Sequence, residues 1–306
     1  MSIDKYSGVI PAFYACYDEQ GEISETGTRA LARHLLDRGV KGLYVGGSSG
    51  ECIYLEKEER MKTLEAVMAE VGGQCTVIAH VACNNTRESC ELARHAERLG
   101  VDAVASIPPI YFHLPEYAIA KYWNDISAAA PNTDFIIYNI PQLAGVALTP
   151  SLFREMRKNP RVVGVKNSSM PTYDLEIWRR IGGPDLAVFN GPDEQFAAGR
   201  VSGACGGIGG TYAVMPELFL KMDALIRSGD VLGAEEIQHT VNDIIETMCA
   251  AHGNMYAVAK KILEINSGLH CGSVRAPLAP MLDSDLPVAE NAARKIREAV
   301  SRFCGK

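Results

Sequence analysis

Short apolar runs alternate with longer segments of helical period through most of this chain. The runs are rich in Val, Ile, Ala, Tyr and Phe and do not alternate cleanly with polar residues, which is typical of strands covered on both faces. Eight such runs predict strands, at residues 8–17, 42–48, 76–82, 102–109, 135–141, 162–169, 186–193 and 206–214.

Each of these runs is followed by a segment that predicts a helix. The first, at 25–39, has Ser24 or Thr26 as a candidate N-cap and ends at Gly39. The others lie at 57–73, 87–100, 115–131, 150–159, 173–181, 194–204 and 216–228. Eight strand–helix units match the size of an α/β fold of the (β/α)8 TIM barrel type, which we expect over residues 1–228. An open doubly wound sheet is the alternative.

The strand signals stop after Gly229. Segments 231–252, 255–266 and 288–303 all have helical period, so we expect a C-terminal helical appendage over residues 229–306. No linker rich in proline or serine separates it from the barrel.

Composition narrows the class of protein. The chain has 306 residues and a formal net charge of -7, which disfavours a nucleic-acid partner because such proteins usually present a basic face. No apolar run approaches the roughly 20 residues of a membrane span, and the N-terminus has no basic-then-apolar leader pattern. Nine cysteines, an odd number without a C-x-x-C pair, predict reduced thiols. We therefore expect a cytoplasmic protein that binds neither nucleic acid nor membrane.

The segment "VVGVKNSS" at 162–169 ends an apolar strand with a lysine, Lys166. Active sites of (β/α)8 barrels lie at the carboxyl ends of the strands, whereas Lys41 precedes its strand and most other lysines lie on predicted helices. A desolvated amine loses its proton more easily, and a neutral amine can attack a carbonyl carbon to form a Schiff base. The alternatives are a lysine that pairs with a carboxylate, one that reaches solvent, and one that binds a phosphate.

Two other strand ends carry hydroxyl groups. In "GGSSGE" (46–51), glycines flank Ser48 and Ser49, so backbone N–H groups and hydroxyls can approach an anion such as a carboxylate. The alternative is a tight turn in which a serine caps a helix. In "YNIP", Tyr138 can relay a proton or position a carbonyl oxygen, or it can be a buried tyrosine with a satisfied hydroxyl.

The seventh strand ends in "NGPDEQF", in which Asp193 and Glu194 can accept hydrogen bonds from sugar hydroxyls. Acidic residues after Pro192 are also ordinary at the start of a helix, and that alternative stays open. The segment "GACGGIGG" (203–210) lacks the spacing of a nucleotide loop and favours a close-packed strand end. No histidine or cysteine has metal-ligand spacing, so we predict neither a metal nor a cofactor.

The motifs "GLYVGGSSGE", "YNIP", "GVKNSS" and "GGIGGTY", in this order, resemble the N-acetylneuraminate lyase and dihydrodipicolinate synthase superfamily. The resemblance covers nearly the whole chain. It implies a class I aldolase-type barrel that works without metal and is usually a homotetramer. Lys166 would form the Schiff base, and Tyr138 would work with Ser48. Ser48 and Ser49 would hold the pyruvate carboxylate, and Tyr111 in "PPIYF" would reach the site across a dimer interface.

The resemblance also distinguishes two branches. Synthases look like Y-N-V-P-x-R, whereas this chain has Leu143 at the arginine position, and leucine cannot pair with a carboxylate. "NGPDE" resembles the G-x-D-E motif of sialic acid lyases, so Gly191, Asp193 and Glu194 would bind a polyhydroxylated tail.

Three further positions bear on the substrate. Ser168 stands where the lyases have threonine, and "GIGGTY" supplies Ile208 and Gly210 to the substrate site. The lyases look like G-I-G-S-T-Y, so Gly210 lacks a hydroxyl. We expect an aldolase that cleaves a 2-keto sugar acid, N-acetylneuraminate or a related acid, to pyruvate and an aldehyde sugar.

Three alternatives stay open. A synthase or dehydratase of the same superfamily is one, although Leu143 counts against a synthase. A phosphosugar isomerase barrel would use Gly206 to Gly210 as a phosphate cradle. A barrel that only binds its ligand is the third, and the combination of lysine, tyrosine and serine at strand ends argues against it.

Overall fold

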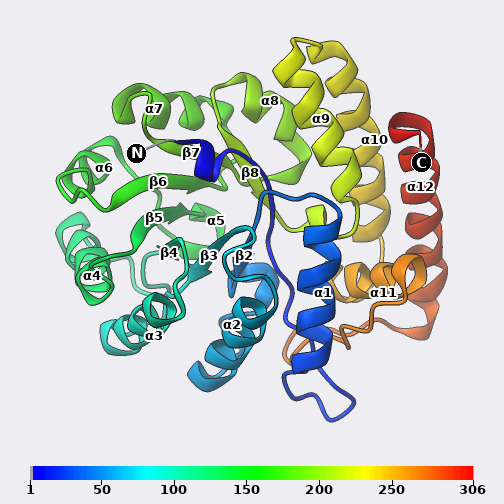
Figure 1. Cartoon of the computed structure of the whole chain (residues 1–306), viewed down its shortest axis with the longest axis horizontal. Coiled ribbons are helices and arrows are strands. Elements are labelled where there is room, and N and C mark those ends of the chain that lie inside the picture. Colours follow the sequence, from blue (N-terminus) through cyan, green and yellow to red (C-terminus); the bar gives the residue numbers. More distant parts are fainter. Residues whose placement is uncertain (1–2, 306) are drawn as a thin grey trace.

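A computed structural model describes residues 3–305 of the chain. Eight parallel strands form its centre, and helices surround them (Figure 1). The strands are β1 (Gly8–Pro11), β2 (Gly42–Val45), β3 (Thr76–His80), β4 (Ala103–Ser106), β5 (Asp134–Asn139), β6 (Val162–Asn167), β7 (Ala187–Asn190) and β8 (Gly206–Gly209).

The strands form a near-closed barrel and not an open sheet. Their order is β1-β8-β7-β6-β5-β4-β3-β2, and the neighbours pair in parallel. The two end strands meet just beyond β1, where Ala12 forms a parallel bridge with Tyr44. There the Phe13 N–H donates a hydrogen bond to the Tyr44 carbonyl oxygen at 2.9 Å. The predicted (β/α)8 barrel is therefore confirmed.

The strands are mainly apolar because both of their faces are buried. One buried cluster fills the barrel interior and includes Ile10, Ile136 and Phe189. A second cluster lies between the strands and the helices and includes Val45 and Val165. This double burial explains why the runs do not alternate with polar residues.

The predicted barrel helices are all present, with small shifts at their ends. Ser24 caps the first of them by accepting a hydrogen bond from the Gly27 N–H at 3.1 Å. An additional short helix, α5 (Pro141–Ala144), was not predicted. The others are α1 (Glu25–Asp37), α2 (Lys57–Val71), α3 (Thr86–Leu99), α4 (Glu116–Ala129), α6 (Pro150–Met156), α7 (Thr172–Gly182), α8 (Phe196–Val201) and α9 (Pro216–Ser228).

The first predicted strand, 8–17, is too long. Only residues 8–11 form β1, yet the chain beyond it stays buried. Tyr14, for example, is 0% exposed, and its hydroxyl donates to the Gly210 carbonyl oxygen at 2.5 Å. The apolar pattern at 12–17 therefore reflects burial above the barrel and not strand pairing.

Three helices follow the barrel, as predicted: α10 (Val231–Cys249), α11 (Met255–Ser267) and α12 (Leu286–Cys304). Helices α9, α10 and α12 lie side by side at one edge of the molecule (Figure 1). One buried cluster joins Phe219 of α9, Val241 of α10 and Ile262 of α11, so the appendage shares a core with the barrel. The domain boundary between residues 228 and 229 remains a prediction.

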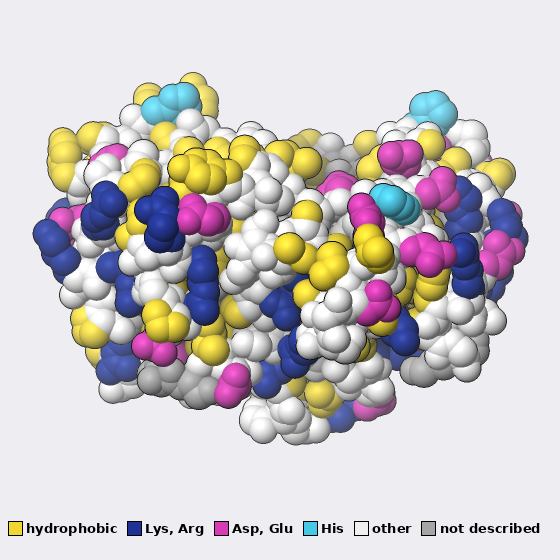
Figure 2. Space-filling model, turned by 90° about the horizontal axis from the view of Figure 1, so that it is seen from above, with side chains coloured by type: hydrophobic (Ala, Val, Ile, Leu, Met, Phe, Trp, Pro, Cys, Tyr) yellow, Lys and Arg dark blue, Asp and Glu magenta, His cyan; other side chains and the backbone are white. Residues whose placement is uncertain are grey.

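The surface carries charges of both signs. Figure 2 shows one face, on which basic and acidic side chains are interspersed among apolar ones. A nucleic-acid-binding face would instead be mainly basic. Within residues 3–305, none of the helices is both long enough and apolar enough to cross a lipid bilayer.

Candidate active site

Two cavities lie at opposite ends of the barrel. One, of about 880 Å³, lies at the amino ends of the strands and is lined by Lys41, Thr76 and Arg227. The other, of about 330 Å³, lies at the carboxyl ends, where (β/α)8 barrels have their active sites. It is lined by the predicted residues Ser48, Ser49, Tyr138, Lys166, Ser168, Gly191, Asp193, Glu194, Ile208 and Gly210.

Lys166 lies at the base of this cavity, near the end of β6. It is 4% exposed, and its Nζ lies 3.9 Å from the ring centroid of Tyr138 and 4.3 Å from that of Tyr44. Burial lowers the pKa of Lys166 to about 7, although the nearby Asp193 carboxylate acts to raise it. A large fraction of the amine is therefore neutral near pH 7, which is the form that attacks a carbonyl.

Tyr138 is the neighbour of Lys166 on β5, because the two residues are partners in the parallel register. Its hydroxyl forms hydrogen bonds with Ser48 and Ser168. Burial raises the pKa of Tyr138 to about 12, and these two hydrogen bonds partly oppose that rise. Tyr138 is thus a phenol at neutral pH, beside the amine and linked to both serine-bearing loops. It can give a proton to a leaving hydroxide.

The serine turn, residues Ser48–Gly50, is the short helix η2 that follows β2. Ser48 is half-buried, whereas Ser49 is 4% exposed. Ser49 Oγ donates a hydrogen bond to the Tyr256 hydroxyl oxygen at 3.0 Å. The turn therefore presents two hydroxyl groups to the cavity, one toward Tyr138 and one toward α11.

The two acids at the end of β7 lie in different surroundings. Asp193 is buried, and its Oδ2 accepts hydrogen bonds from the Thr211 N–H and Oγ1, both at 2.6 Å. Burial raises the pKa of Asp193 to about 6, and the two bonds from Thr211 partly offset this. Glu194 is exposed at the cavity. Asp193 thus fixes the loop after β8, while Glu194 is free to meet a polar ligand.

Two glycines keep the cavity open. A Cβ on Gly191 would lie 2.0 Å from Ser168 Oγ, so no side chain fits there without displacing this serine. A Cβ on Gly210 would lie 3.1 Å from Ser49 Oγ and 3.2 Å from Cε1 of Tyr256. Tyr256 therefore occupies the space beside the position at which the lyase motif has a serine.

Comparison with known proteins identifies the family. Residues 5–296 match the Dihydrodipicolinate synthetase family. This chain belongs to that family. Within the family it lies on the N-acetylneuraminate lyase branch: it is 62% identical to the N-acetylneuraminate lyase of Mediterraneibacter gnavus, over 99% of this chain and 96% of that protein.

Other members of the dihydrodipicolinate synthetase family agree with this placement. The chain is 34% identical to N-acetylneuraminate lyase 2 of Escherichia coli over 97% of each protein. Among solved structures, wild-type Ruminococcus gnavus sialic acid aldolase matches with a TM-score of 0.97 and 62% identity, over 98% of this chain and 99% of that one. A related structure is described as the catalytic lysine mutant of the same aldolase.

The structure adds site residues that the sequence did not suggest. Tyr256 comes from α11 and lines the cavity. Tyr44 is fully buried, and its ring lies 5.8 Å from that of Tyr138. His80 Nδ1 lies 2.8 Å from the Gly46 carbonyl oxygen, and burial lowers the pKa of His80 to about 3. The sequence feature that could have pointed to these two residues is a polar ring within an otherwise apolar strand, Tyr44 in β2 and His80 in β3.

Tyr111 is the predicted site residue that does not line the cavity of this chain. It is 86% exposed and has a positive φ of 82°. Leu143 of α5 does line the cavity, so an apolar side chain stands where the synthase pattern has an arginine.

The polar side chains that line the cavity include hydroxyl groups, the Lys166 amine, the Gln142 amide and the two carboxyl groups of Asp193 and Glu194. Within residues 3–305, no group of three or more histidine, cysteine, aspartate or glutamate side chains is arranged to hold a metal ion.

Proposed function

We propose that this enzyme cleaves N-acetylneuraminate, or a closely related 2-keto sugar acid, to pyruvate and an aldehyde sugar, through a Schiff base on Lys166. Its relatives at 62% identity are an N-acetylneuraminate lyase and a sialic acid aldolase. The observation that carries the proposal is Lys166 itself, an amine buried at a strand end with its pKa lowered to about 7.

The first step forms the imine. The neutral Lys166 amine attacks the C2 carbonyl of the open-chain sugar acid, and the adduct loses water to give a protonated imine. The Tyr138 phenol, next to Lys166 in the register, supplies the proton for the leaving hydroxide. The phenolate that remains is stabilised by the positive charge of the imine.

The second step breaks the bond between C3 and C4. The phenolate removes the proton of the C4 hydroxyl, and C4 becomes the aldehyde carbon. The electron pair of the C3–C4 bond moves toward the protonated imine nitrogen, which gives an enamine. Protonation of the enamine at C3 and addition of water then release pyruvate and restore the amine. Ser48 and Ser168, both hydrogen-bonded to Tyr138, are placed to pass protons to and from its oxygen.

Polar groups around the cavity suit the two ends of such a substrate. Ser48 and Ser49 supply hydroxyls for the carboxylate, near the base of the site. Glu194 supplies exposed acceptors for the hydroxyls of the tail. Leu143 gives no cation for a second carboxylate, so a polyhydroxylated chain is preferred over aspartate semialdehyde.

The quaternary structure and the location belong to the same proposal. Tyr111, Phe112 and Tyr117 are 86%, 71% and 79% exposed, an arrangement that favours a subunit interface. We infer a homotetramer in which Tyr111 reaches the site of a neighbouring subunit. The cysteine pattern favours the cytoplasm, where thiols stay reduced.

A substrate panel tests the proposed function. The values of kcat/KM are compared for cleavage of N-acetylneuraminate and simpler 2-keto sugar acids and for condensation of pyruvate with aspartate semialdehyde. We expect cleavage of N-acetylneuraminate to dominate by at least about 10³-fold, because buried polar groups left unpaired penalise the wrong substrate. Efficient condensation without cleavage of any sugar acid would contradict the proposal.

A further inference from the structure

The residue that directly follows the serine turn has an uncommon conformation. Glu51 follows η2, has a positive φ of 57° and is 1% exposed. A left-handed backbone outside glycine persists only where the surroundings enforce it. The Glu51 N–H donates a hydrogen bond to the Ser48 carbonyl oxygen at 3.0 Å, and the side chain of Glu51 is anchored as well.

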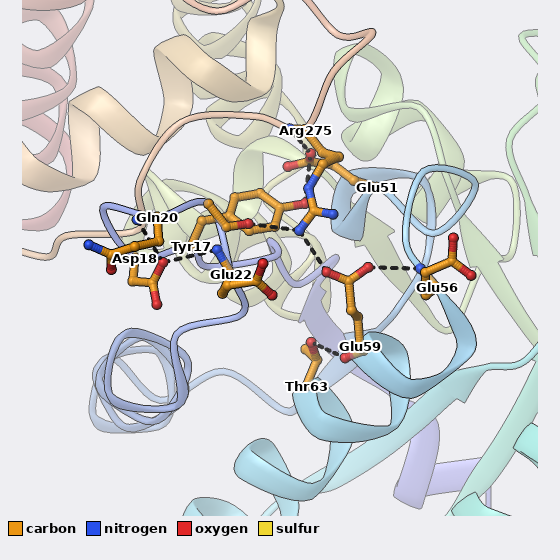
Figure 3. A network of polar contacts seen from close by, with 10 residues as sticks. Tyr17, Asp18, Gln20, Glu22, Glu51, Glu56, Glu59, Thr63 and Arg275 are labelled. Carbon is orange, nitrogen blue, oxygen red and sulfur yellow. Dashed lines mark hydrogen bonds and ion pairs between the residues drawn. The ribbon is translucent and has the colours of Figure 1, made fainter.

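Three separate segments bind the Glu51 carboxylate. Its Oε1 accepts a hydrogen bond from Lys260 Nζ of α11 at 2.7 Å. Its Oε2 accepts one from the Tyr17 hydroxyl at 3.0 Å and one from the Arg275 backbone N–H at 2.6 Å, and Figure 3 shows both residues beside Glu51. One carboxylate thus joins the serine turn to the loop after β1, to α11 and to the segment between α11 and α12.

The ion pair with Lys260 is completely hidden from solvent. Lys260 Nζ also donates to the Ser273 carbonyl oxygen at 2.5 Å and lies 4.6 Å from the ring centroid of Tyr17. Two charges that have lost their water are costly to separate, because each would be left buried without a partner. The pair therefore couples the conformation of the serine turn to the position of α11.

Helix α11 makes a second contact with the same turn. Tyr256 precedes Lys260 by four residues and so lies on the same face of the helix. Its hydroxyl accepts the hydrogen bond from Ser49 Oγ at 3.0 Å. One helix face thus contacts residues 49 and 51, on both sides of Gly50.

A buried ion pair is by itself weak evidence for stability. Arg200 of α8 and Asp223 of α9 form a comparable pair, with Nε and Oδ1 2.7 Å apart and side chains 10% and 9% exposed. Neither of these two residues lines the cavity. The pair of Glu51 and Lys260 differs because one partner directly follows the serine turn.

We propose that Lys260 and Tyr256 of α11 are positioning residues for the serine turn, acting through Glu51 and Ser49. The C-terminal helices are then part of the active site. The inference rests on the proposed function, in which Ser48 and Ser49 hold the substrate carboxylate. Such donors act only when held to within about 0.5 Å of their working position, which a three-residue helix cannot secure alone.

The test separates carboxylate binding from imine chemistry. Borohydride reduces the pyruvate imine irreversibly, so the rate of labelling is followed against pyruvate concentration. In Lys260→Met we expect half-saturation to require about 10–100-fold more pyruvate, while the saturated rate falls less than about 3-fold because Lys166 is untouched. Tyr256→Phe keeps the ion pair and should shift half-saturation by about 3–10-fold.

Arg200→Met is the control, since it breaks the other buried pair; Asp223 keeps Arg227 as a second partner, with Nε and Oδ2 2.8 Å apart. It should lower the thermal midpoint as Lys260→Met does, yet leave half-saturation by pyruvate unchanged. The proposal is overturned if the pyruvate concentration at half-saturation is unchanged in Lys260→Met, or if it increases equally in Arg200→Met. If Lys260→Met does not fold, Tyr256→Phe decides: unchanged half-saturation refutes the positioning role.

A failure of the proposed function would give a different result from a failure of the positioning role. If the wild-type enzyme traps no pyruvate at all, the Schiff-base mechanism is wrong, and crystal structures of the wild type and of Tyr256→Phe and Lys260→Met then decide the positioning role. Displacement of Ser49 and loss of the positive φ of Glu51 in Lys260→Met support it. A serine turn that superimposes on the wild type in both variants overturns it.

Discussion

Lys166 and Lys260 are both buried, but their surroundings differ. Lys166, at the end of β6, lies against the rings of Tyr44 and Tyr138, and burial lowers its pKa to about 7. Lys260, on α11, has its Nζ 2.7 Å from a carboxylate oxygen of Glu51. Both amines lie over aromatic rings, since Lys260 Nζ is 4.6 Å from the ring centroid of Tyr17, but Lys260 also forms an ion pair with a carboxylate.

The difference explains why burial alone does not make a nucleophile. An amine without a carboxylate in contact loses its proton at lower pH, because its charge is no longer solvated. An amine in contact with a buried carboxylate forms a cross-link between segments. We therefore assign chemistry to Lys166 and positioning to Lys260, and the predictions below separate the two roles.

The largest effect is expected for Lys166→Met. Cleavage should fall by about 10⁴-fold or more, because no other group in the cavity can form the imine. Steady-state kinetics and circular dichroism would measure activity and fold. Lys41→Met, at the opposite end of the barrel, is the control and should keep nearly full activity. Substantial cleavage by Lys166→Met would show that Lys166 is not the nucleophile.

The same variant should change how stability depends on pH. The pKa of Lys166 is about 7 in the folded protein and near 10.5 when unfolded, so between these values the unfolded chain binds more protons. Wild-type stability should therefore rise with pH through this window. Lys166→Met should be more stable than the wild type below pH 7, on the order of a few kcal/mol, with the gain shrinking toward pH 10.

Chemical denaturation at pH 6, 8 and 10 would measure this difference. If the difference in unfolding free energy between the wild type and Lys166→Met is the same at all three pH values, Lys166 is not desolvated in the folded enzyme.

Tyr138→Phe should lower kcat by about 10²–10⁴-fold, because the variant can neither give nor take the proton. Tyr44→Phe is a matched control on the other ring beside Lys166. The Tyr44 hydroxyl is buried and has no hydrogen-bond partner among residues 3–305. Its removal should leave kcat within about 3-fold and should not lower stability. Equal losses in both variants would show that the Tyr138 hydroxyl has no distinct role in proton transfer.

Smaller effects are expected at the two acids. Glu194→Gln should raise KM for the sugar acid by about 10-fold and leave pyruvate labelling intact, because we propose that the exposed Glu194 side chain binds only the tail of the substrate. Asp193→Asn should also lower the thermal midpoint, since its Oδ2 holds Thr211. Identical behaviour of the two variants would contradict the distinct roles given to them.

Sequence patterns were sufficient to predict the barrel and to name residues that the structure brings together in one cavity at its rim. In a parallel barrel all carboxyl strand ends lie on one rim, so residues such as Ser48, Tyr138 and Lys166 must converge there. The register that makes Tyr138 and Lys166 neighbours follows from the same geometry.

The contributions of α11 could not be predicted in this way. Tyr256 and Lys260 meet Ser49 and Glu51 across about 200 residues of sequence, and a helical period shows only that a face is buried, not what covers it. The true end of β1 was missed for a similar reason, since burial of residues 12–17 imitates a strand. The place of Tyr111 depends on a second subunit and stays a prediction.

Peptide mapping after reduction with borohydride in the presence of pyruvate tests the central claim most directly. The account predicts one pyruvate-derived mass increment per chain, on the peptide that contains Lys166, with none on the peptide that contains Lys260. The labelling rate should rise with pH through about 7, as the Lys166 amine loses its proton. A label on another lysine, or no label in an enzyme that cleaves its substrate, would contradict it.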